Sequence, residues 1–268
     1  MAHWTAAILH AIRTALICPL LATLALSACA PPDDSWTRLR QSGTLRVGMD
    51  ASYPPFEWIA QDGTLTGFDV ELARELGQRL GLDVQFVANL PYDGLYDALA
   101  MRQVDVIISA LVISPDRMDD FAYSMAYFDA GQVLVVRADE QNVIALADLA
   151  GRTLAVELGS QGDLAARTLM GRSSTVSLVP CQTAQEALDL VERTEADAAL
   201  VDHVSALVDS ARGQLMILEG MVVEEPYAVA VRHGEDALLQ AINNALAAMS
   251  ADGTLRSLHT YWLERQDG

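Results

Sequence analysis

From residue 44 to the end of the chain, short runs rich in apolar and β-branched residues alternate with amphipathic helical patterns. This alternation constrains the fold strongly, because a strand followed by a helix returns to its sheet as a parallel neighbour. We therefore expect an α/β protein with mostly parallel sheets, and the number of strands favours two sheets over one. The expected strands are 44–49, 84–87, 104–109, 132–137, 153–158, 175–179, 198–201 and 227–231, and the clearest helices are 69–80, 183–193 and 237–250.

Two of these helices carry specific signals. Thr183 and Glu186 have the spacing of a capping box at the start of helix 183–193. Helix 69–80 has the apolar spacing of a helix that packs on a sheet. The residues on that apolar face are Val70, Leu72, Ala73, Leu76 and Leu80.

The first 28 residues have the composition of a signal peptide. They contain no acidic residue, and the apolar stretch 15–26 is too short and too interrupted to span a bilayer comfortably. The segment Leu26-Ser27-Ala28-Cys29 resembles a lipoprotein signal, in which the cysteine becomes the lipidated first residue. We expect an exported chain, anchored at Cys29 in the periplasm or at the cell surface, with a polar tether over 29–35. An ordinary signal with an incidental cysteine is the alternative.

The net charge of −19 argues against nucleic-acid binding, because so acidic a chain repels phosphate backbones. All 17 basic residues are arginine. After Cys29 the only cysteine is Cys181, so no internal disulfide can form and the exported fold depends on its core.

The segment 104–117 is predicted to form a buried strand, a loop and the start of a helix. Ser114 and Pro115 are the expected N-cap and first-turn proline, which places Arg117 in the first helical turn. A cation at that end opposes the helix dipole, whereas a docked anion would be held by the guanidinium and by free N–H groups. Arg117 is therefore a candidate anion-binding residue. The alternative is an exposed arginine or one paired with Asp116, Asp119 or Asp120.

Three further places are candidates for ligand contact. Ser160 follows a strand and lies between two glycines, where backbone N–H groups can face a ligand. Asp202 ends another strand, and open α/β sheets place their ligands at such ends. A helix N-cap is the alternative for both residues. Tyr53 and Phe56 flank two prolines and either stack on a ligand or cover the core.

No arrangement of residues demands an enzyme. His203, His233 and His259 are far apart and lack the spacing of metal ligands. The chain contains no nucleophile elbow, no phosphate-binding loop, no dinucleotide-binding fingerprint and no paired-cysteine motif. Cys181 has the character of a small core residue. We expect no catalytic residue, no metal site and no cofactor.

A series of short motifs follows in a fixed order along the chain. They are Leu45-Arg-Val-Gly-Met-Asp50, Tyr53-Pro-Pro-Phe56, Gly67-Phe-Asp-Val-Glu-Leu-Ala73, Val104-Asp-Val-Ile-Ile-Ser109, Ser114-Pro-Asp-Arg117, Gly159-Ser160, Ala196-Asp-Ala-Ala-Leu-Val-Asp202, Tyr227-Ala-Val-Ala-Val-Arg232 and Asp252-Gly253. Their order and spacing resemble the family 3 extracellular solute-binding proteins, the polar amino-acid receptors of ABC importers, from about residue 45 to residue 265.

The resemblance implies a two-lobed periplasmic-binding-protein fold (type II), with the ligand in the interlobe cleft. It places lobe 1 at 36–131 plus 226–268 and lobe 2 at 132–225. It also implies three groups of ligand contacts. Arg117, with backbone N–H groups near Val112 and at Ser160 and Gln161, would hold a carboxylate; Asp202 and the carbonyl of Ala110 would hold an ammonium; Tyr53 and Tyr92 would sandwich the ligand side chain, with Asp50 and Ser109 at its far end.

Val112 departs from the family pattern, because relatives usually carry a Ser or Thr whose hydroxyl binds the ammonium. Losing that hydroxyl removes a hydrogen bond worth about 1–3 kcal/mol. Ala110 likewise lacks a hydroxyl that some relatives use. A conventional α-amino group is therefore less well supported than the carboxylate.

We expect a monomeric receptor that closes its lobes on an amino acid or related small carboxylate and delivers it to an ABC permease. A zwitterion leaving water must have both charges paired, and Arg117 and Asp202 lie on different lobes in this interpretation. Ligand binding would thus favour the closed state. The alternatives are an exported enzyme on the same scaffold, such as a cyclohexadienyl dehydratase, and a sensory module for a membrane partner.

Overall fold

The computed structural model describes residues 35–170 and 175–264, except for the side chains of 169 and 170. The predicted signal peptide and Cys29 lie outside the described residues. The described chain begins with α2 (Ser35–Ser42), whose Ser35 is buried. In the part of the chain that is described, no helix has both the length and the apolar character needed to cross a membrane.

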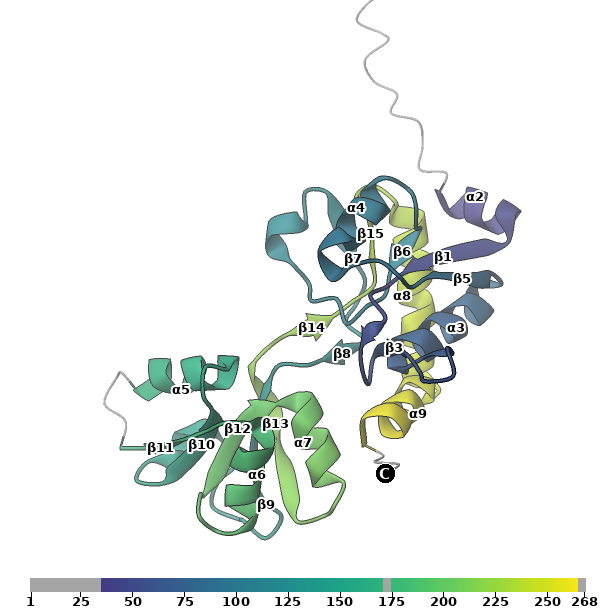
Figure 1. The fold of residues 1–268 in the computed structure, drawn as a ribbon. Helices are drawn as coiled ribbons and strands as arrows, with labels where there is room; N and C mark the ends of the chain where they lie inside the picture. Colours follow the sequence, from purple (N-terminus) through teal and green to yellow (C-terminus); the bar gives the residue numbers. More distant parts are fainter. Residues whose placement is uncertain (1–34, 171–174, 265–268) are drawn as a thin grey trace, which may run out of the picture. The chain divides into compact units, whose positions relative to one another are not determined.

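Two five-stranded sheets form the framework, as the strand count predicts (Figure 1). The strand order is β5-β1-β6-β15-β7 in the first sheet and β11-β10-β12-β9-β13 in the second. The strands of the first are β1 (Thr44–Gly48), β5 (Asp83–Val87), β6 (Val106–Ile107), β7 (Phe121–Tyr123) and β15 (Ala230–Arg232); those of the second are β9 (Gln132–Arg137), β10 (Thr153–Glu157), β11 (Ser177–Cys181), β12 (Ala198–Asp202) and β13 (Leu215–Val223).

The prediction of mostly parallel sheets is wrong for half of the strand pairings. In the first sheet β1 runs parallel to β5 and β6, but β15 runs antiparallel to β6 and β7. In the second, β10 runs parallel to β11 and β12, whereas β9 runs antiparallel to β12 and β13. β9 and β15 are the strands that each sheet receives directly after the chain arrives from the other sheet. Each of these two strands therefore begins at the edge of the sheet where the parallel strands end. It then runs antiparallel to its neighbours.

The chain passes between the sheets twice, and the two passages pair with each other. β8 (Phe128–Asp129) runs antiparallel to β14 (Pro226–Tyr227). The Asp129 carboxylate accepts hydrogen bonds from the backbone N–H groups of Gly131 and Glu225, both at 2.9 Å. One side chain thus ties both passages together.

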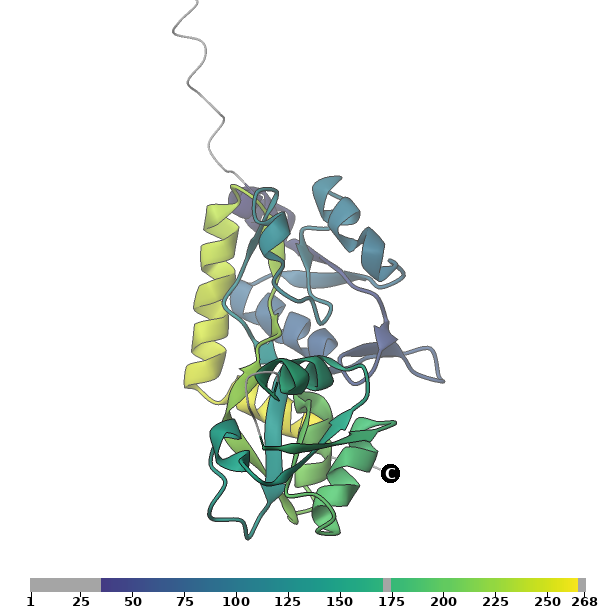
Figure 2. The same ribbon diagram turned by 90° about the vertical axis from the view of Figure 1, so that its left-hand side faces the viewer.

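Helices cover the sheets and fill the core. In α3 (Phe68–Leu80), Val70, Leu72, Ala73 and Leu76 are buried and Leu80 is partly buried, as the apolar spacing predicts. α3 packs beside α8 (Asp236–Ala251) in the first core (Figures 1 and 2). The remaining helices are α4 (Leu95–Ala100), α5 (Gln161–Met170), α6 (Ala184–Glu192), α7 (His203–Ser210) and α9 (Thr254–His259), with short turns η1 (Tyr92–Gly94), η2 (Pro115–Arg117), η3 (Leu146–Leu149) and η4 (Thr260–Glu264).

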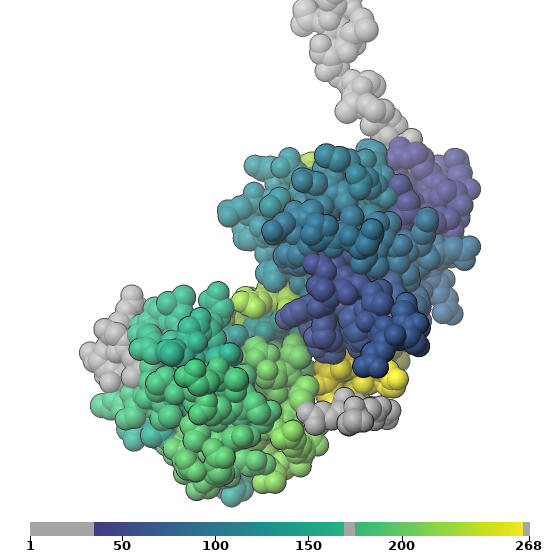
Figure 3. All heavy atoms as spheres, viewed as in Figure 1, coloured from purple at the N-terminus to yellow at the C-terminus, as the bar shows by residue number. Residues whose placement is uncertain are grey.

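Several predicted elements differ from the observed ones. The predicted strand 227–231 is split into β14 and β15, because residues 228 and 229 bond to the chain at Leu111 and Ser124 between them. The long strand β13 was not predicted: its apolar run is broken by Glu219 and Gly220, where the register shifts. A small sheet also follows β1, made of β2 (Ser52–Tyr53), β3 (Glu57–Ile59) and β4 (Leu65–Thr66), whose surface is dark blue in Figure 3.

The capping box at Thr183 is half confirmed. The Thr183 side chain accepts a hydrogen bond from the Glu186 N–H (3.1 Å), as predicted. The Glu186 carboxylate accepts instead from the N–H of Gln182 (2.7 Å), one residue earlier than a capping box requires.

Candidate functional site

The ends of β1 and β6 open onto a pocket of about 350 Å³. These strands are parallel neighbours, so the residues that follow them meet at one edge of the sheet. Open α/β sheets bind their ligands at this edge. The lining residues are Asp50, Ser52, Tyr53, Glu57, Tyr92, Ser109, Ala110, Val112 and Tyr227. The structure therefore brings together Asp50, Tyr53, Tyr92, Ser109, Ala110 and Val112 from the sequence-predicted contacts.

Tyr53 and Tyr92 present aromatic surface to the pocket. The two residues are 50% and 45% exposed, although each is a large aromatic residue. Tyr53 stacks on the fully buried Phe56, with ring centroids 5.7 Å apart and planes 9° from parallel. Of the two aromatic residues flanking the prolines, Phe56 thus belongs to the core and Tyr53 to the pocket. Burial raises the pKa of Tyr92, so its hydroxyl stays protonated at neutral pH.

Asp50 carries the carboxylate at one end of the pocket. Its Oδ1 accepts a hydrogen bond from the Ser52 hydroxyl (2.7 Å) and its Oδ2 from the Tyr92 N–H (3.0 Å). These two bonds fix the orientation of the carboxylate. Each carboxylate oxygen has a second lone pair, so Asp50 can still accept from a cationic ligand group.

Ser109 ties Asp50 to a buried acid that the sequence analysis did not single out. The Ser109 hydroxyl accepts from the Asp50 N–H (3.0 Å) and donates to Oε1 of Glu57 (2.7 Å). Glu57 lines the pocket but is only 1% exposed. Its position after the prolines and Phe56 gave no sign of burial, since a Glu beside a loop is usually exposed.

A second buried carboxylate, Asp69 at the start of α3, is coupled to Glu57. Oδ2 of Asp69 accepts from the Ala110 N–H (2.5 Å) and from the Tyr127 hydroxyl (2.9 Å). Oε2 of Glu57 and Oδ1 of Asp69 are both buried, with no hydrogen-bond partner among the described residues. Each carboxyl group shifts the pKa of the other, so the two groups lie close together. A single proton shared between these oxygens satisfies both.

The proton belongs to Glu57. Burial raises the pKa of both acids, because each would lose its hydration when charged. Asp69 offsets part of that loss through its two donors, Ala110 and Tyr127, and its charge then raises the pKa of Glu57 further. At neutral pH the pair therefore consists of a neutral Glu57 that donates to an ionised Asp69.

This acid pair also holds the backbone at Ala110. Ala110 has φ of 43°, a left-handed conformation that is costly for a residue with a side chain. Its N–H is bonded to Asp69, while its carbonyl accepts no hydrogen bond from any described residue. Among the described residues, no donor uses the Ala110 carbonyl, which the resemblance assigns to the ligand ammonium.

Arg117 is not among the residues that line the pocket. The predicted helix after Pro115 is wrong: η2 is a single 3-10 turn, and the Ser114 side chain makes no capping bond. So short a turn has little dipole, and the dipole argument for Arg117 does not apply. Its guanidinium instead stacks on the Tyr96 ring, 4.3 Å from the centroid. Among the described residues it has no ion-pair partner, and it is exposed. Of the two alternatives, the exposed arginine therefore holds and the pairing with a neighbouring aspartate does not.

Stacking on Tyr96 leaves the N–H edge of Arg117 available, because the ring covers only the face of the guanidinium. Tyr96 is held in turn by the Tyr123 hydroxyl at 2.8 Å. Val112, whose backbone is a predicted carboxylate donor, lines the pocket and forms an isolated antiparallel bridge with Tyr227.

The remaining predicted contacts lie in the second sheet, after the parallel strands β10 and β12. The Ser160 hydroxyl caps α5 by accepting from the Asp163 N–H (3.1 Å), and the Ser160 N–H donates to the Glu157 carbonyl. The Asp202 Oδ1 caps α7 by accepting from the Ser205 N–H (2.8 Å). The N-cap alternative thus describes both residues. The Gln161 N–H and Oδ2 of Asp202 have no partner among the described residues.

Gln132 is a second residue that the sequence analysis missed. It starts β9, pairs in register with Asp202, and is buried, with Oε1 unpartnered among the described residues. A Cβ on Gly162 would lie 2.7 Å from that oxygen. A lone amide in the otherwise apolar run 132–136 was the available signal. No group of residues in the described chain could hold a metal ion.

Comparison with known proteins identifies the family of this chain. Residues 45–265 match the bacterial extracellular solute-binding proteins, family 3, and the chain belongs to that family. Family members are extracytoplasmic solute-binding proteins with two α/β lobes, and this fold is of that type.

Relatives and solved structures agree with this assignment. The L-cystine-binding protein TcyJ of Escherichia coli (strain K12) is 32% identical over 228 residues, which cover 84% of each chain. The L-cystine solute receptor of Neisseria gonorrhoeae, solved unliganded and open, has a TM-score of 0.73 and 28% identity, and covers 86% of this chain and 97% of that chain. An ancestral cyclohexadienyl dehydratase has a TM-score of 0.72 and 26% identity, and covers 86% and 96%.

The neutral state of Glu57 predicts a specific pH dependence. The unfolded chain loses this proton near its ordinary pKa of about 4.3, whereas the folded protein keeps it. Unfolding therefore releases a proton above that pH, and stability falls as pH rises, by up to about 1.4 kcal/mol per pH unit. Glu57→Gln has no proton to release. Its free energy of unfolding, measured with urea at about pH 5.5, 7 and 9, should improve relative to wild type as pH rises.

The surface carboxylates contribute equally to the pH dependence of unfolding in wild type and in Glu57→Gln. The difference between the two free energies of unfolding therefore reports on Glu57. Gln retains one donor and one acceptor for Asp69 and Ser109, so the variant should fold. Parallel stability curves for wild type and variant would contradict a neutral Glu57.

Proposed function

We propose that this protein is the solute receptor of an amino-acid ABC importer, and that its ligand is an α-amino acid with a second cationic group at the far end. The observation that carries this proposal is the pocket itself: two exposed tyrosine rings beside an oriented, ionisable Asp50. Rings of this kind hold an extended side chain and stack on a cation.

The ligand's own charges would be paired by residues on the two sheets. Arg117 would hold the carboxylate with its free guanidinium edge, and Oδ2 of Asp202 would accept from the α-ammonium beside the Ala110 carbonyl. A buried, unpaired charge costs several kcal/mol, so a ligand would bind firmly only where both partners reach it. Such a ligand bridges residues of 36–131 and 132–225, the proposed lobes, and would favour their closure.

The second cation is inferred from Asp50 and from the relatives. L-cystine, the ligand in the name of TcyJ, carries two ammonium groups, so one could face Asp202 and the other Asp50. Arginine and lysine present a cation at a similar distance from their α-carbon. Neutral Glu57 adds no negative charge at this end, so Asp50 is the charge that selects for the second cation.

Transport rather than catalysis is favoured by what the pocket offers. Among its described lining residues, the only carboxylates are Asp50, held by two donors, and Glu57, whose proton is committed to Asp69. A dehydratase needs an acid or base that faces its substrate. We expect no turnover of prephenate or arogenate. Turnover of either compound would contradict the receptor and show that the protein is a dehydratase.

The receptor would be a monomer held at the membrane by a lipid on Cys29 and would pass its ligand to the ABC permease. The resemblance of residues 26–29 to a lipoprotein signal supports this anchor. Cys29→Ser should move the protein from the membrane fraction to the soluble extracytoplasmic fraction. If the variant stays in the membrane fraction, the proposed lipid at Cys29 is contradicted.

A ligand screen tests the receptor. The chain without residues 1–29, stripped of ligand by unfolding and refolding, is heated with L-cystine, arginine, lysine, neutral amino acids or small carboxylates. A ligand at 100 times its dissociation constant adds about 2.7 kcal/mol, which raises the melting temperature by a few degrees. We expect the largest rise with the amino acids that carry two cations.

Three variants and a control assign the contacts. Arg117→Ala and Asp202→Ala should each weaken binding about 30-fold or more, since each leaves a ligand charge unpaired. Asp50→Asn should weaken the binding of ligands with a second cation and leave the binding of neutral amino acids unchanged. Arg193→Ala, an exposed arginine outside the pocket, is the control. Equal binding by Arg117→Ala and the control, or no rise with any compound, would contradict the proposal.

A further inference from the structure

Gln132 and Asp202 lie opposite each other at one edge of the second sheet. β9 begins at Gln132 and β12 ends at Asp202, and the two residues pair in register in the antiparallel ladder. Paired residues of antiparallel strands carry their side chains on the same face of the sheet, with Cβ atoms about 5 Å apart. The Gln132 amide and the Asp202 carboxylate therefore start from neighbouring positions on one face.

That face is the one that α5 covers. Strand residues alternate between the two faces of a sheet, so Gln132 shares its face with Leu134, and Asp202 shares its face with Leu200. Leu134 and Leu200 belong to the core cluster that contains Ala166 of α5. Both polar side chains therefore lie on the α5 side of the sheet.

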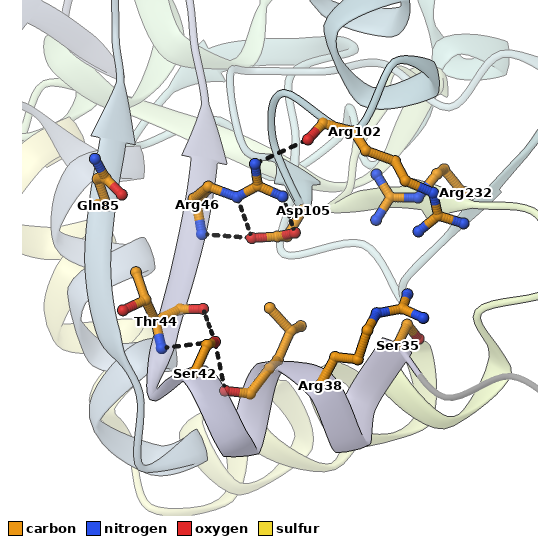
Figure 4. A pocket seen from close by; sticks show the side chains of 10 residues that line it. Ser35, Arg38, Ser42, Thr44, Arg46, Gln85, Arg102, Asp105 and Arg232 are labelled. Atoms are coloured by element: carbon orange, nitrogen blue, oxygen red, sulfur yellow. Dashed lines mark hydrogen bonds and ion pairs between the residues drawn. The ribbon is translucent and has the colours of Figure 1, made fainter.

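The amide oxygen of Gln132 is buried without a partner. Gln132 is 5% exposed, and its Oε1 accepts no hydrogen bond from any described residue. Buried polar groups are normally paired, as Figure 4 shows for Asp105, which accepts from Nε and Nη2 of Arg46 at 2.9 and 2.7 Å. A methionine would continue the apolar run 133–136 without leaving an oxygen unpartnered. The packing of the fold therefore gives no reason for an amide at this position.

The amide has room and partners for a half-turn. The point that a Cβ on Gly162 would occupy lies 2.7 Å from Oε1 of Gln132, 2.8 Å from the Leu200 carbonyl oxygen and 3.3 Å from Ser160 Oγ. The last torsion of a glutamine side chain is broad and roughly two-fold. A half-turn about this torsion directs the amide NH2 group toward the other two oxygens, which accept hydrogen bonds, and turns Oε1 away from Gly162.

We propose that Gln132 is a specificity residue of the receptor, and that its amide oxygen accepts a hydrogen bond from the α-ammonium group of the ligand. This inference rests on the proposed function, which assigns the ammonium group to Oδ2 of Asp202 and to the Ala110 carbonyl. An ammonium group has three N–H donors, and the Val112 side chain offers no acceptor for the third. Gln132 supplies the third acceptor, beside Asp202.

The charges around Asp202 explain why the third acceptor is a neutral amide. Burial raises the pKa of Glu225, and the negative charges of Asp129 and Asp202 raise it further, so these carboxyl groups lie close enough to interact. A further carboxylate in place of Gln132 would be repelled by Asp202. An amide adds an acceptor for the ammonium group without adding another negative charge.

The test compares wild type, Gln132→Met and Gln78→Met as full chains, stripped of ligand, by calorimetric titration. The probes are L-arginine and L-cystine, each compared with its analogue that lacks α-amino groups. Gln132→Met should bind the amino acids about tenfold more weakly, the value of one lost hydrogen bond to a charged group, and bind the analogues as wild type does. Gln78→Met, which removes an exposed amide from α3, should bind every probe as wild type does.

The ligand-free melting temperature of Gln132→Met should equal or exceed that of wild type, because the variant buries no unpartnered oxygen. Equal weakening of amino acids and analogues would show that Gln132 only supports the fold, and it overturns the proposal. Unchanged binding of the amino acids overturns it too, and leaves the proposed function standing. If wild type binds neither amino acid, the proposed ligand class is contradicted, and this inference with it.

Discussion

The ligand pocket depends on one constraint: the buried carboxyl groups of Glu57 and Asp69 must share a proton. Two acids without water can coexist only if one stays neutral, because two buried negative charges would cost many kcal/mol. Here the neutral acid is Glu57, and Asp69 keeps its charge with the help of Ala110 and Tyr127. The pair connects β3 to the start of α3 and to the loop that follows β6.

Two parts of the pocket lining, at Asp50 and at Ala110, depend on this connection. Through Ser109, Glu57 fixes the backbone at Asp50, and through Asp69 it fixes the left-handed Ala110. Loss of the proton would place a second charge beneath the pocket and remove the donor between the acids. The polar network thus sets the shape of the site, while the surrounding apolar core supplies most of the stability of the fold.

Much of the fold followed from the sequence. Apolar spacing predicted α3 within one residue, and the strand runs predicted β9 and β10 closely. The antiparallel β15 could not be predicted, since direction depends on the edge by which the chain enters a sheet. β13 was missed because Glu219 and Gly220 interrupt its pattern at a bulge.

The site was predicted in part. Asp50 and Ser109 were predicted from the resemblance to the family 3 solute-binding proteins, and both line the pocket. The position of a residue at a strand end was the argument for Asp202, which is the last residue of β12 in the second sheet. Glu57 was not found, since nothing local marks a glutamate as buried; its environment is made by Asp69 and Ser109, distant in sequence. Arg117 was selected for a helix dipole that is absent, and only the structure shows the Tyr96 ring that orients it.

Infrared spectroscopy tests the neutral Glu57 most directly, because a protonated carboxyl group has a carbonyl stretch well separated from that of a carboxylate. The account predicts such a band in the wild-type protein at neutral pH, persisting into mildly alkaline solution and missing from Glu57→Gln. A wild-type spectrum at neutral pH without the band, or a band of equal strength in the variant, would contradict the shared proton that holds the pocket together.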